Sequence, residues 1–337
     1  MRRNWTIDRT PRTAFACMIA LALMLLALSG LRPAAAAEKV IYLLPAPVQL
    51  SAFGPWVIAK ARGYYAKAGY DVEFQVAHGG VDVAKQVGVG NAPIGGALGD
   101  TSIIVRSNGV PVRTVALLGG GSLMVVVARK DRGIRAVKDL KGKTIGVLSY
   151  QDTTYYALLG MLASVGLTKS DANIQAVGPS AITSLVIAGK ADACACTPDW
   201  EILVENGVKD GTVAMPSNRY FPAMAQAIVA SDSEIKTNPK LVDAIVRATL
   251  DGMKAIMDNP ATAAKTFADA PPSWKGKEAL LTRIFANFVE RSYKGQRVLG
   301  AMDPVRLAKL QDFYLKQGLI ERATPVAELY TNRFVEK

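Results

Sequence analysis

The sequence predicts an α/β protein of two domains, and the order of its segments is the main reason. Apolar runs typical of buried strands alternate with helical patterns, with strands expected at 40–44, 72–76, 93–98, 112–118, 123–128, 144–148, 173–177 and 191–196. This alternation predicts parallel sheets covered by helices on both faces. Beyond Ser231 helical patterns follow one another without strands between them, which predicts a helical tail that folds back onto an earlier domain.

Several helix ends are marked by capping residues. A helix over 153–165 is expected to stop at Gly166, and Ser180 is expected to cap a second one that Gly189 ends. In the tail, Asn238 precedes a proline that opens a long helix, and Asp303 precedes another.

The first residues have the pattern of an export signal. Four arginines in residues 1–12 precede an apolar run over 14–28, and the small residues Ala34–Ala37 follow. A membrane anchor would need about 20 apolar residues, and this run is shorter. We therefore expect export by the general secretory route, cleavage near Ala37, and a periplasmic protein. The remaining 300 residues are enough for two domains.

Charge and cysteine content narrow the possible partners. Without the five arginines and one aspartate of residues 1–37, the chain carries 35 basic and 27 acidic residues, a net charge of +8. The basic residues form no dense run with interleaved aromatics, which argues against nucleic acid as a partner. Cys194 and Cys196 alternate on an expected strand, and we interpret them as two small buried residues. A bond between them would close a small strained ring, and the sequence leaves open whether they are bonded.

Two crossings between the domains are expected. The turn Gly119–Ser122 and the run 123–128 form the first, and the run 225–230 forms the return. The expected domains are therefore 38–122 plus 231–337, and 123–230, after a signal peptide at 1–37. A hinge near Ser122 and Ala230 would join them.

Four segments resemble a known family in order and spacing. They are 55–72 (PWVIAKARGYYAKAGYDV), 109–112 (GVPV), 139–147 (DLKGKTIGV) and 189–193 (GKADA). Together they are similar to the nitrate/sulfonate/taurine-type binding proteins, the SsuA/THI5-like group. The resemblance implies a type II periplasmic-binding-protein fold, with two α/β domains joined by a hinge and a helical C-terminal tail. It also implies a monomeric receptor without a cofactor, which serves the permease subunits and ATPase of an ABC importer.

Candidate ligand-binding residues follow from the rule that open α/β sheets bind ligands beyond the carboxyl ends of their strands. The rule selects loops 45–53, 77–81, 98–101 and 149–154, and the resemblance adds 197–200. From these loops we take Gln49, Phe53, His78, Gly79, Asp100, Thr101, Tyr150, Gln151, Asp152, Thr153, Asp199 and Trp200.

Several of these residues have a purely structural interpretation. His78 lies in a loop, where a surface position is the alternative to ligand contact. Asp100 and Asp152 both stand where a helix cap belongs. Trp200 could be core, and we interpret Trp56 as packing.

Asp152 departs from the family pattern. Relatives place small residues at this helix start, which leaves room for an anion, whereas the carboxylate of Asp152 would repel one. The sequence therefore favours a flat or aromatic ligand over a simple sulfonate, with Tyr150, Phe53 and Trp200 as candidate contacts.

An enzyme on the same fold is the main alternative. The THI5 branch includes a pyrimidine synthase with a run of cysteines late in its second domain, where this chain has Ala-Met-Ala-Gln at 223–226. No zinc-ligand spacing, phosphate loop or nucleophile elbow appears. A binding protein is therefore expected, with a transporter-independent sensory protein as a further alternative.

Overall fold

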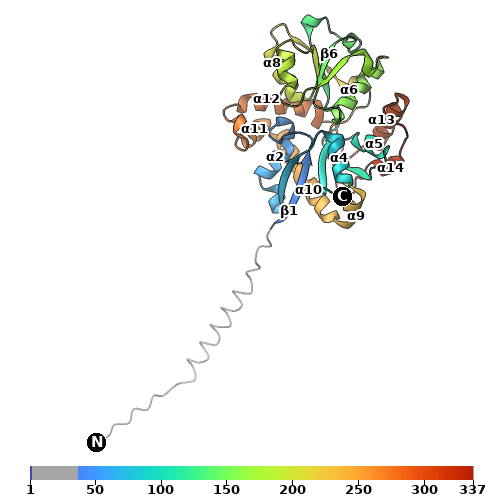
Figure 1. Ribbon diagram of the computed structural model, residues 1–337. Helices are drawn as coiled ribbons and strands as arrows, with labels where there is room; N and C mark the ends of the chain where they lie inside the picture. The colour runs from blue at the N-terminus through green and yellow to red at the C-terminus, as the bar shows by residue number, and fades with distance from the viewer. Residues whose placement is uncertain (2–36, 337) are drawn as a thin grey trace. The chain divides into compact units, whose positions relative to one another are not determined.

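The computed structural model describes Met1 and residues 37–336, and these form two five-stranded sheets. The expected signal peptide and its cleavage site before Glu38 lie almost wholly outside the described residues. Figure 1 shows the strands of the two sheets and the helices that cover them. None of the helices described combines the length and apolar character that a membrane span requires.

Sheet A contains the first four strands and a late one. Its order is β2 (Tyr70–Val76), β1 (Glu38–Leu44), β3 (Ile94–Leu98), β10 (Gln226–Ser231) and β4 (Val112–Leu117). Its helices are η1 (Ser51–Phe53), α2 (Gly54–Ala61), α3 (Tyr64–Lys67), α4 (Gly80–Gly88) and α5 (Thr101–Arg106). We call this sheet with these helices lobe A.

Sheet B contains the middle strands. Its order is β7 (Asn173–Ala176), β6 (Thr144–Val147), β8 (Ala193–Cys196), β5 (Val125–Arg129) and β9 (Thr212–Pro216). Its helices are α6 (Thr153–Ser164), α7 (Ile182–Ile187) and α8 (Pro198–Gly207), with short turns η2 (Lys130–Arg132), η3 (Val137–Leu140), η4 (Lys169–Asp171) and η5 (Ser217–Arg219). We call this sheet with these elements lobe B.

The expectation of purely parallel sheets is wrong, because each sheet has one strand that runs against its neighbours. β10 is antiparallel to β3 and β4, and β5 is antiparallel to β8 and β9. The chain enters sheet A from lobe B through β10, and it enters sheet B from lobe A through β5. Each of these strands begins where the carboxyl ends of its neighbours lie and therefore runs in the opposite direction. In β10, for example, the first residue, Gln226, pairs with Leu98, the last residue of β3.

All eight strands predicted from the sequence are present, and the fold class is confirmed. The edge strand β9 was missed, since three of its five residues are only half-buried. The run 225–230, expected as the return crossing, lies mainly in β10 of sheet A. The division into domains 38–122 plus 231–337, and 123–230, remains a prediction.

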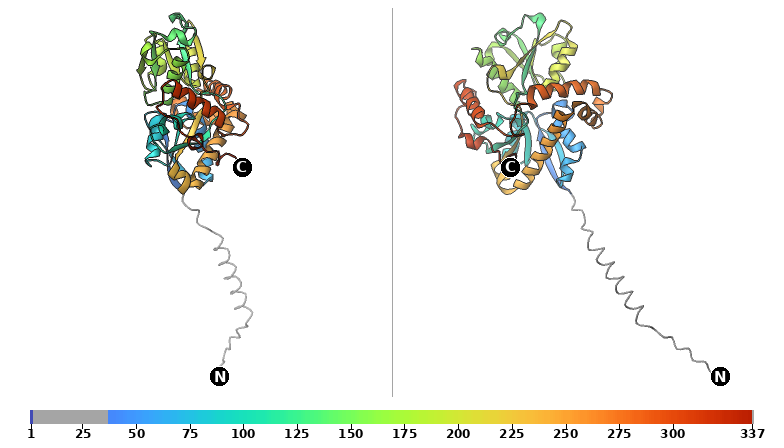
Figure 2. Two further views of the ribbon diagram at one scale, coloured as in Figure 1. Left: turned by 90° about the vertical axis from the view of Figure 1, so that its right-hand side faces the viewer. Right: turned by 180° about the vertical axis from the view of Figure 1, so that it is seen from behind.

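The helical tail follows β10. It consists of α9 (Asp232–Thr237), α10 (Pro239–Asp258), α11 (Pro260–Ala268), η6 (Pro272–Trp274), α12 (Glu278–Phe288), the π-helix η7 (Val289–Tyr293), α13 (Pro304–Lys316) and α14 (Val326–Leu329). α10 packs along α2 of lobe A, whereas α12 packs against α8 of lobe B. Seen from behind in Figure 2, orange-red α12 runs between the two sheets, so the tail contacts both lobes.

Capping explains several helix boundaries. The Asp152 side chain caps α6 and that of Asp303 caps α13, as their positions before the helices predict. Ser180 does not cap α7, whose N-cap position is held by Ala181. α7 therefore begins one residue later than the predicted cap implies, and it is only six residues long.

Candidate ligand-binding site

A cavity of about 50 Å³ lies between the two lobes, beyond the carboxyl ends of β1, β3, β6 and β8. Most of its wall is apolar or glycine: Pro45, Ala46, Leu50, Ala52, Phe53, Trp56, Gly80, Gly96, Ala97, Leu98, Leu123, Leu148 and Trp200. The polar members are Asp152, Thr153, Thr154, Thr197 and Gln226. This is the position that the strand-end rule predicts.

Aromatic rings from both lobes wall the cavity. Phe53 and Trp56 come from lobe A, where their rings meet edge to face with centroids 5.8 Å apart. Trp200 comes from the first turn of α8 in lobe B and is 5% exposed. Trp56, interpreted from the sequence as packing, is fully buried and also lines the cavity.

Asp152 joins the starts of two helices that belong to different lobes. Its Oδ1 accepts a hydrogen bond from the Thr154 amide of α6 at 3.0 Å and another from the Thr154 hydroxyl. Its Oδ2 accepts from the Gly80 amide at the start of α4, at 3.2 Å. Burial raises the pKa of Asp152, and the bonds from Thr154 and Gly80 oppose that rise. The capping role is therefore present, together with a contact across the cavity that the sequence did not predict.

Further hydrogen bonds join loop 77–81 of lobe A to loop 149–154 of lobe B around Asp152, and we call this contact the seam. The Val81 amide donates to the Gln151 carbonyl at 3.0 Å, and the Ser149 hydroxyl donates to the His78 carbonyl at 2.9 Å. The backbones approach so closely that a Cβ on Gly79 would stand 2.7 Å from backbone atoms of Asp152. Gly79 has φ +109°, which also favours glycine. The predicted loops 77–81 and 149–154 thus meet each other directly.

Thr101 and Thr153 form a second link between the lobes. Their hydroxyl oxygens lie 2.8 Å apart, and that of Thr101 also accepts from the Leu98 amide. The preceding residue, Asp100, makes no cap bond and instead accepts from the Tyr314 hydroxyl of α13. Burial raises the pKa of Asp100 to about 6. The structure therefore places Asp100 beneath the cavity wall and not on it.

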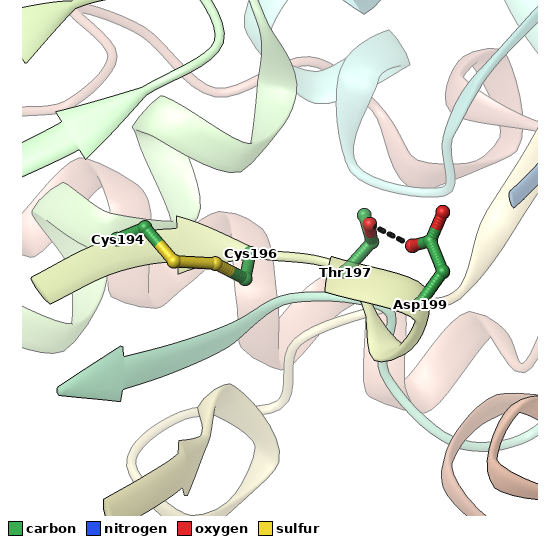
Figure 3. The surroundings of a disulfide bond; sticks show 4 residues. All are labelled: Cys194, Cys196, Thr197 and Asp199. Carbon is green, nitrogen blue, oxygen red and sulfur yellow. Dashed lines mark hydrogen bonds between the residues drawn. A yellow bond between two sulfur atoms is a disulfide. The ribbon is translucent and has the colours of Figure 1, made fainter. Parts of the chain in front are cut away.

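Asp199 forms a third link between the lobes. Its Oδ2 accepts from the Ser51 hydroxyl of lobe A at 3.2 Å, and its Oδ1 accepts from the Thr197 hydroxyl. Figure 3 shows this Thr197–Asp199 pair at the start of α8, directly after the strand that carries Cys194 and Cys196. Burial raises the pKa of Asp199.

Cys194 and Cys196 form a disulfide, a point that the sequence had left open. Both lie in β8 and are fully buried, as expected. Their neighbours include Val125 of β5 and Trp200 of α8. No group of His, Cys, Asp and Glu side chains within residues 37–336 is arranged to hold a metal ion.

Some predicted residues do not line the cavity. The Gln49 carbonyl accepts from the Trp274 indole, and Tyr150 is 51% exposed with its hydroxyl donating to the Ile174 carbonyl. His78 is exposed and Gln151 takes part through its backbone. For these residues, as for Phe53, Asp152, Thr153 and Trp200 on the wall, ligand contact remains a prediction.

Three polar lining residues were missed by the sequence prediction: Thr154, Thr197 and Gln226. Thr154 and Thr197 lie inside the selected segments, but no pattern singled them out. Gln226 had a signal, since it is the one polar residue in the run Ala-Gln-Ala-Ile-Val-Ala at 225–230. The structure puts it at the start of β10, beside the end of β3.

The connections between the lobes pack against the tail. Arg306 of α13 donates to the carbonyls of Gly120, Gly121 and Ala223, which lie on the two crossings between the sheets. A Cβ on Gly119 would stand 1.9 Å from the Ser292 carbonyl oxygen, so this stretch tolerates only glycine. The expected hinge region is thus attached to η7 and α13.

Comparisons with known proteins support the family resemblance. A family model described as "NMT1/THI5 like" matches residues 51–263. The riboflavin-binding protein RibY of Chloroflexus aurantiacus is 26% identical over 290 residues, which cover 84% of this chain and 82% of RibY. The 4-amino-5-hydroxymethyl-2-methylpyrimidine phosphate synthase of Schizosaccharomyces pombe is 27% identical over 138 residues, 41% of this chain and 39% of the synthase.

The fold also matches solved structures. The alkanesulfonate-binding protein SsuA from Xanthomonas axonopodis pv. citri, described as bound to MOPS, superposes with a TM-score of 0.65 at 17% identity. The match covers 88% of this chain and 98% of SsuA. The type II periplasmic-binding-protein fold is therefore confirmed.

Proposed function

This chain belongs to the NMT1/THI5-like family, and from that premise we propose that it is the solute-binding protein of an ABC import system. Its ligand would be a flat, uncharged aromatic molecule held between the two lobes. The partners would be the permease subunits and ATPase of the importer, and the site of action the periplasm. The observation that carries the proposal is the cavity wall, which contains aromatic side chains and, among the described residues, no Lys, Arg or His.

The aromatic side chains support a flat ligand. Phe53 and Trp56 of lobe A and Trp200 of lobe B line the same cavity, so closure brings rings to it from both lobes. Small-molecule sites are mostly apolar, with a few polar groups that orient the ligand. A planar ring system would bury both faces in such a site.

Charge argues against a simple anion. Among the described residues, neither Lys, Arg nor His lines the cavity, whereas Asp152 does. An anion brought here would lose its hydration without gaining a counter-charge, and it would meet the carboxylate. The basic residues that give the chain its net positive charge therefore do not create a site for an anion in this cavity.

The size of the cavity requires the lobes to separate before ligand can enter. About 50 Å³ is little more than the share of one or two water molecules, whereas ligand pockets measure about 300–1,000 Å³. The links that must loosen are the bonds of Asp152, Thr153 and Asp199 across the cavity. Rotation about the two crossings would release them together.

The relatives support the same ligand class. RibY is named for riboflavin, which carries a flat aromatic ring system, and the match runs along most of both chains. SsuA is described as bound to MOPS, a sulfonate, but it shares only 17% identity. The aromatic cavity of this chain fits the first of these ligands better.

Calorimetric titration of the purified protein tests the proposal. Riboflavin should bind, with quenching of tryptophan fluorescence as Trp56 and Trp200 meet the ring. MOPS and nitrate should bind at least about 100-fold more weakly. Tighter binding of either anion would refute the ligand class and leave the family assignment intact.

The partial match to the pyrimidine synthase gives a second candidate, an enzyme. Mass spectrometry separates the two functions. A binding protein should return its ligand chemically unchanged after prolonged incubation, whereas a synthase that is itself consumed would gain a modification at one of its own residues.

A further inference from the structure

The polar groups around the cavity are mostly hydrogen-bond acceptors whose own donors are already in use. The Thr154 hydroxyl donates to Asp152, and the Thr197 hydroxyl donates to Asp199. The hydroxyls of Thr101 and Thr153 share one bond. A ligand in this cavity therefore finds few free donors.

Gln226 contributes an acceptor that has no partner. Its side chain is 4% exposed, and its Nε2 donates to the Ala52 carbonyl at 2.9 Å. This bond fixes which end of the amide is the oxygen, because a carbonyl can accept only from the nitrogen. The remaining atom, Oε1, is buried and has no hydrogen-bond partner within residues 37–336. An unpaired buried acceptor is unfavourable, so a group that pairs with it is strongly favoured.

Trp56 carries the other unpaired side-chain group on the cavity wall. Its indole Nε1 is buried and has no hydrogen-bond partner within residues 37–336. This nitrogen is a donor, so it can pair only with an acceptor of the ligand. Among the lining residues described, Gln226 is therefore the one whose unpaired group can select a donor of the ligand.

We propose that Gln226 is a specificity-determining residue that selects ring systems with an N–H donor at their edge, as in lactams and imides. This deepens the proposed function and rests on it. The donor of the ligand pairs with Oε1 of Gln226, while the ring lies among Phe53, Trp56 and Trp200. Flat aromatics that lack a donor fit the same walls but leave Oε1 unpaired, and they are discriminated against for that reason.

The test compares riboflavin with 3-methylriboflavin, in which a methyl group replaces the imide hydrogen. Wild-type protein should bind riboflavin at least about tenfold more tightly, the equivalent of one well-formed hydrogen bond. Gln226→Met keeps the length of the side chain and removes the acceptor, so the ratio of the two dissociation constants should fall towards one.

Gln311→Met is the matched control. Gln311 is a buried glutamine of α13 whose Nε2 and Oε1 are both bonded to the Thr324 backbone, away from the cavity. Its replacement should lower stability and leave the ratio unchanged. Because the ratio in wild type needs no variant, the comparison holds even if Gln226→Met does not fold.

The outcomes separate the two proposals. If wild type binds both flavins equally, or if Gln226→Met keeps the preference, the role of Gln226 is refuted while the aromatic ligand class stands. If wild type binds neither flavin nor acridine, a flat ring without a donor, both proposals are refuted. A preference for riboflavin that Gln226→Met abolishes and Gln311→Met retains supports the inference.

Discussion

Replacing Arg306 tests how the lobes are connected. The Nη2 of Arg306 donates to the Gly121 carbonyl at 2.8 Å and also to that of Ala223, while Nη1 donates to Gly120. Gly120 and Gly121 precede β5, and Ala223 precedes β10, so one guanidinium holds both crossings. Arg306→Met keeps much of the aliphatic stem and removes all three bonds.

The expected loss of unfolding free energy follows from these contacts. A hydrogen bond with a charged partner contributes about 1.5–3 kcal/mol, and three are removed. Two effects reduce the total. Burial lowers the pKa of Arg306, which shows that the fold bears a desolvation cost for the guanidinium, and Gly120 lines an open pocket of about 810 Å³ where water can replace the lost donor. We expect a net loss of about 2–3 kcal/mol.

Urea denaturation measures this loss, and hydrogen exchange of residues 118–124 and 222–226 locates it. Arg322→Met is the control, since the Nε of Arg322 makes one bond, to the Ser107 carbonyl of lobe A at 2.7 Å. Because Arg322 is exposed and water can replace its bond, this variant should cost at most about 1 kcal/mol, without faster exchange at the crossings. If Arg306→Met destabilises no more than this control and exchange at the crossings is unchanged, Arg306 does not hold the two crossings.

Three further predictions concern the seam, the core and the cavity. Gly80→Ala would place a Cβ 2.5 Å from the Thr153 hydroxyl oxygen, so the lobes should open and small-angle scattering should show a larger radius of gyration; an unchanged radius would contradict the seam. Burial raises the pKa of Asp100 from 3.8 to about 6, so native protein holds the proton more tightly and stability should rise as pH falls from 6 to 4, by about 2 kcal/mol. Asp100→Asn should remove this part of the rise in denaturation curves at the two pH values, and an identical rise in the variant would disprove its origin. Trp200→Leu should weaken riboflavin binding roughly 10- to 100-fold in calorimetry through lost ring stacking, whereas equal affinity would place the ring elsewhere.

The sequence alone determined the order of elements and the family. Periodicity located eight strands, because buried strands are short apolar runs bounded by turn residues, and Asp152 and Asp303 marked helix starts that the structure retains. The four quoted segments were enough to identify the family, since their order and spacing are local properties of the chain. The strand-end rule also predicted which edge of each sheet would hold a cavity.

Only the tertiary structure decided which side chains of the selected loops face one another. Asp152 proved to join α6 to Gly80, a contact between residues 72 positions apart that no local pattern encodes. Tyr150, predicted as a ligand contact, turned outward, while Gln226 of β10 reached the cavity from a strand that enters sheet A against its neighbours. Local patterns report which way a residue faces within its own element. Which element lies opposite depends on long-range packing and on the crossings between lobes, and these are fixed only when the whole chain has folded.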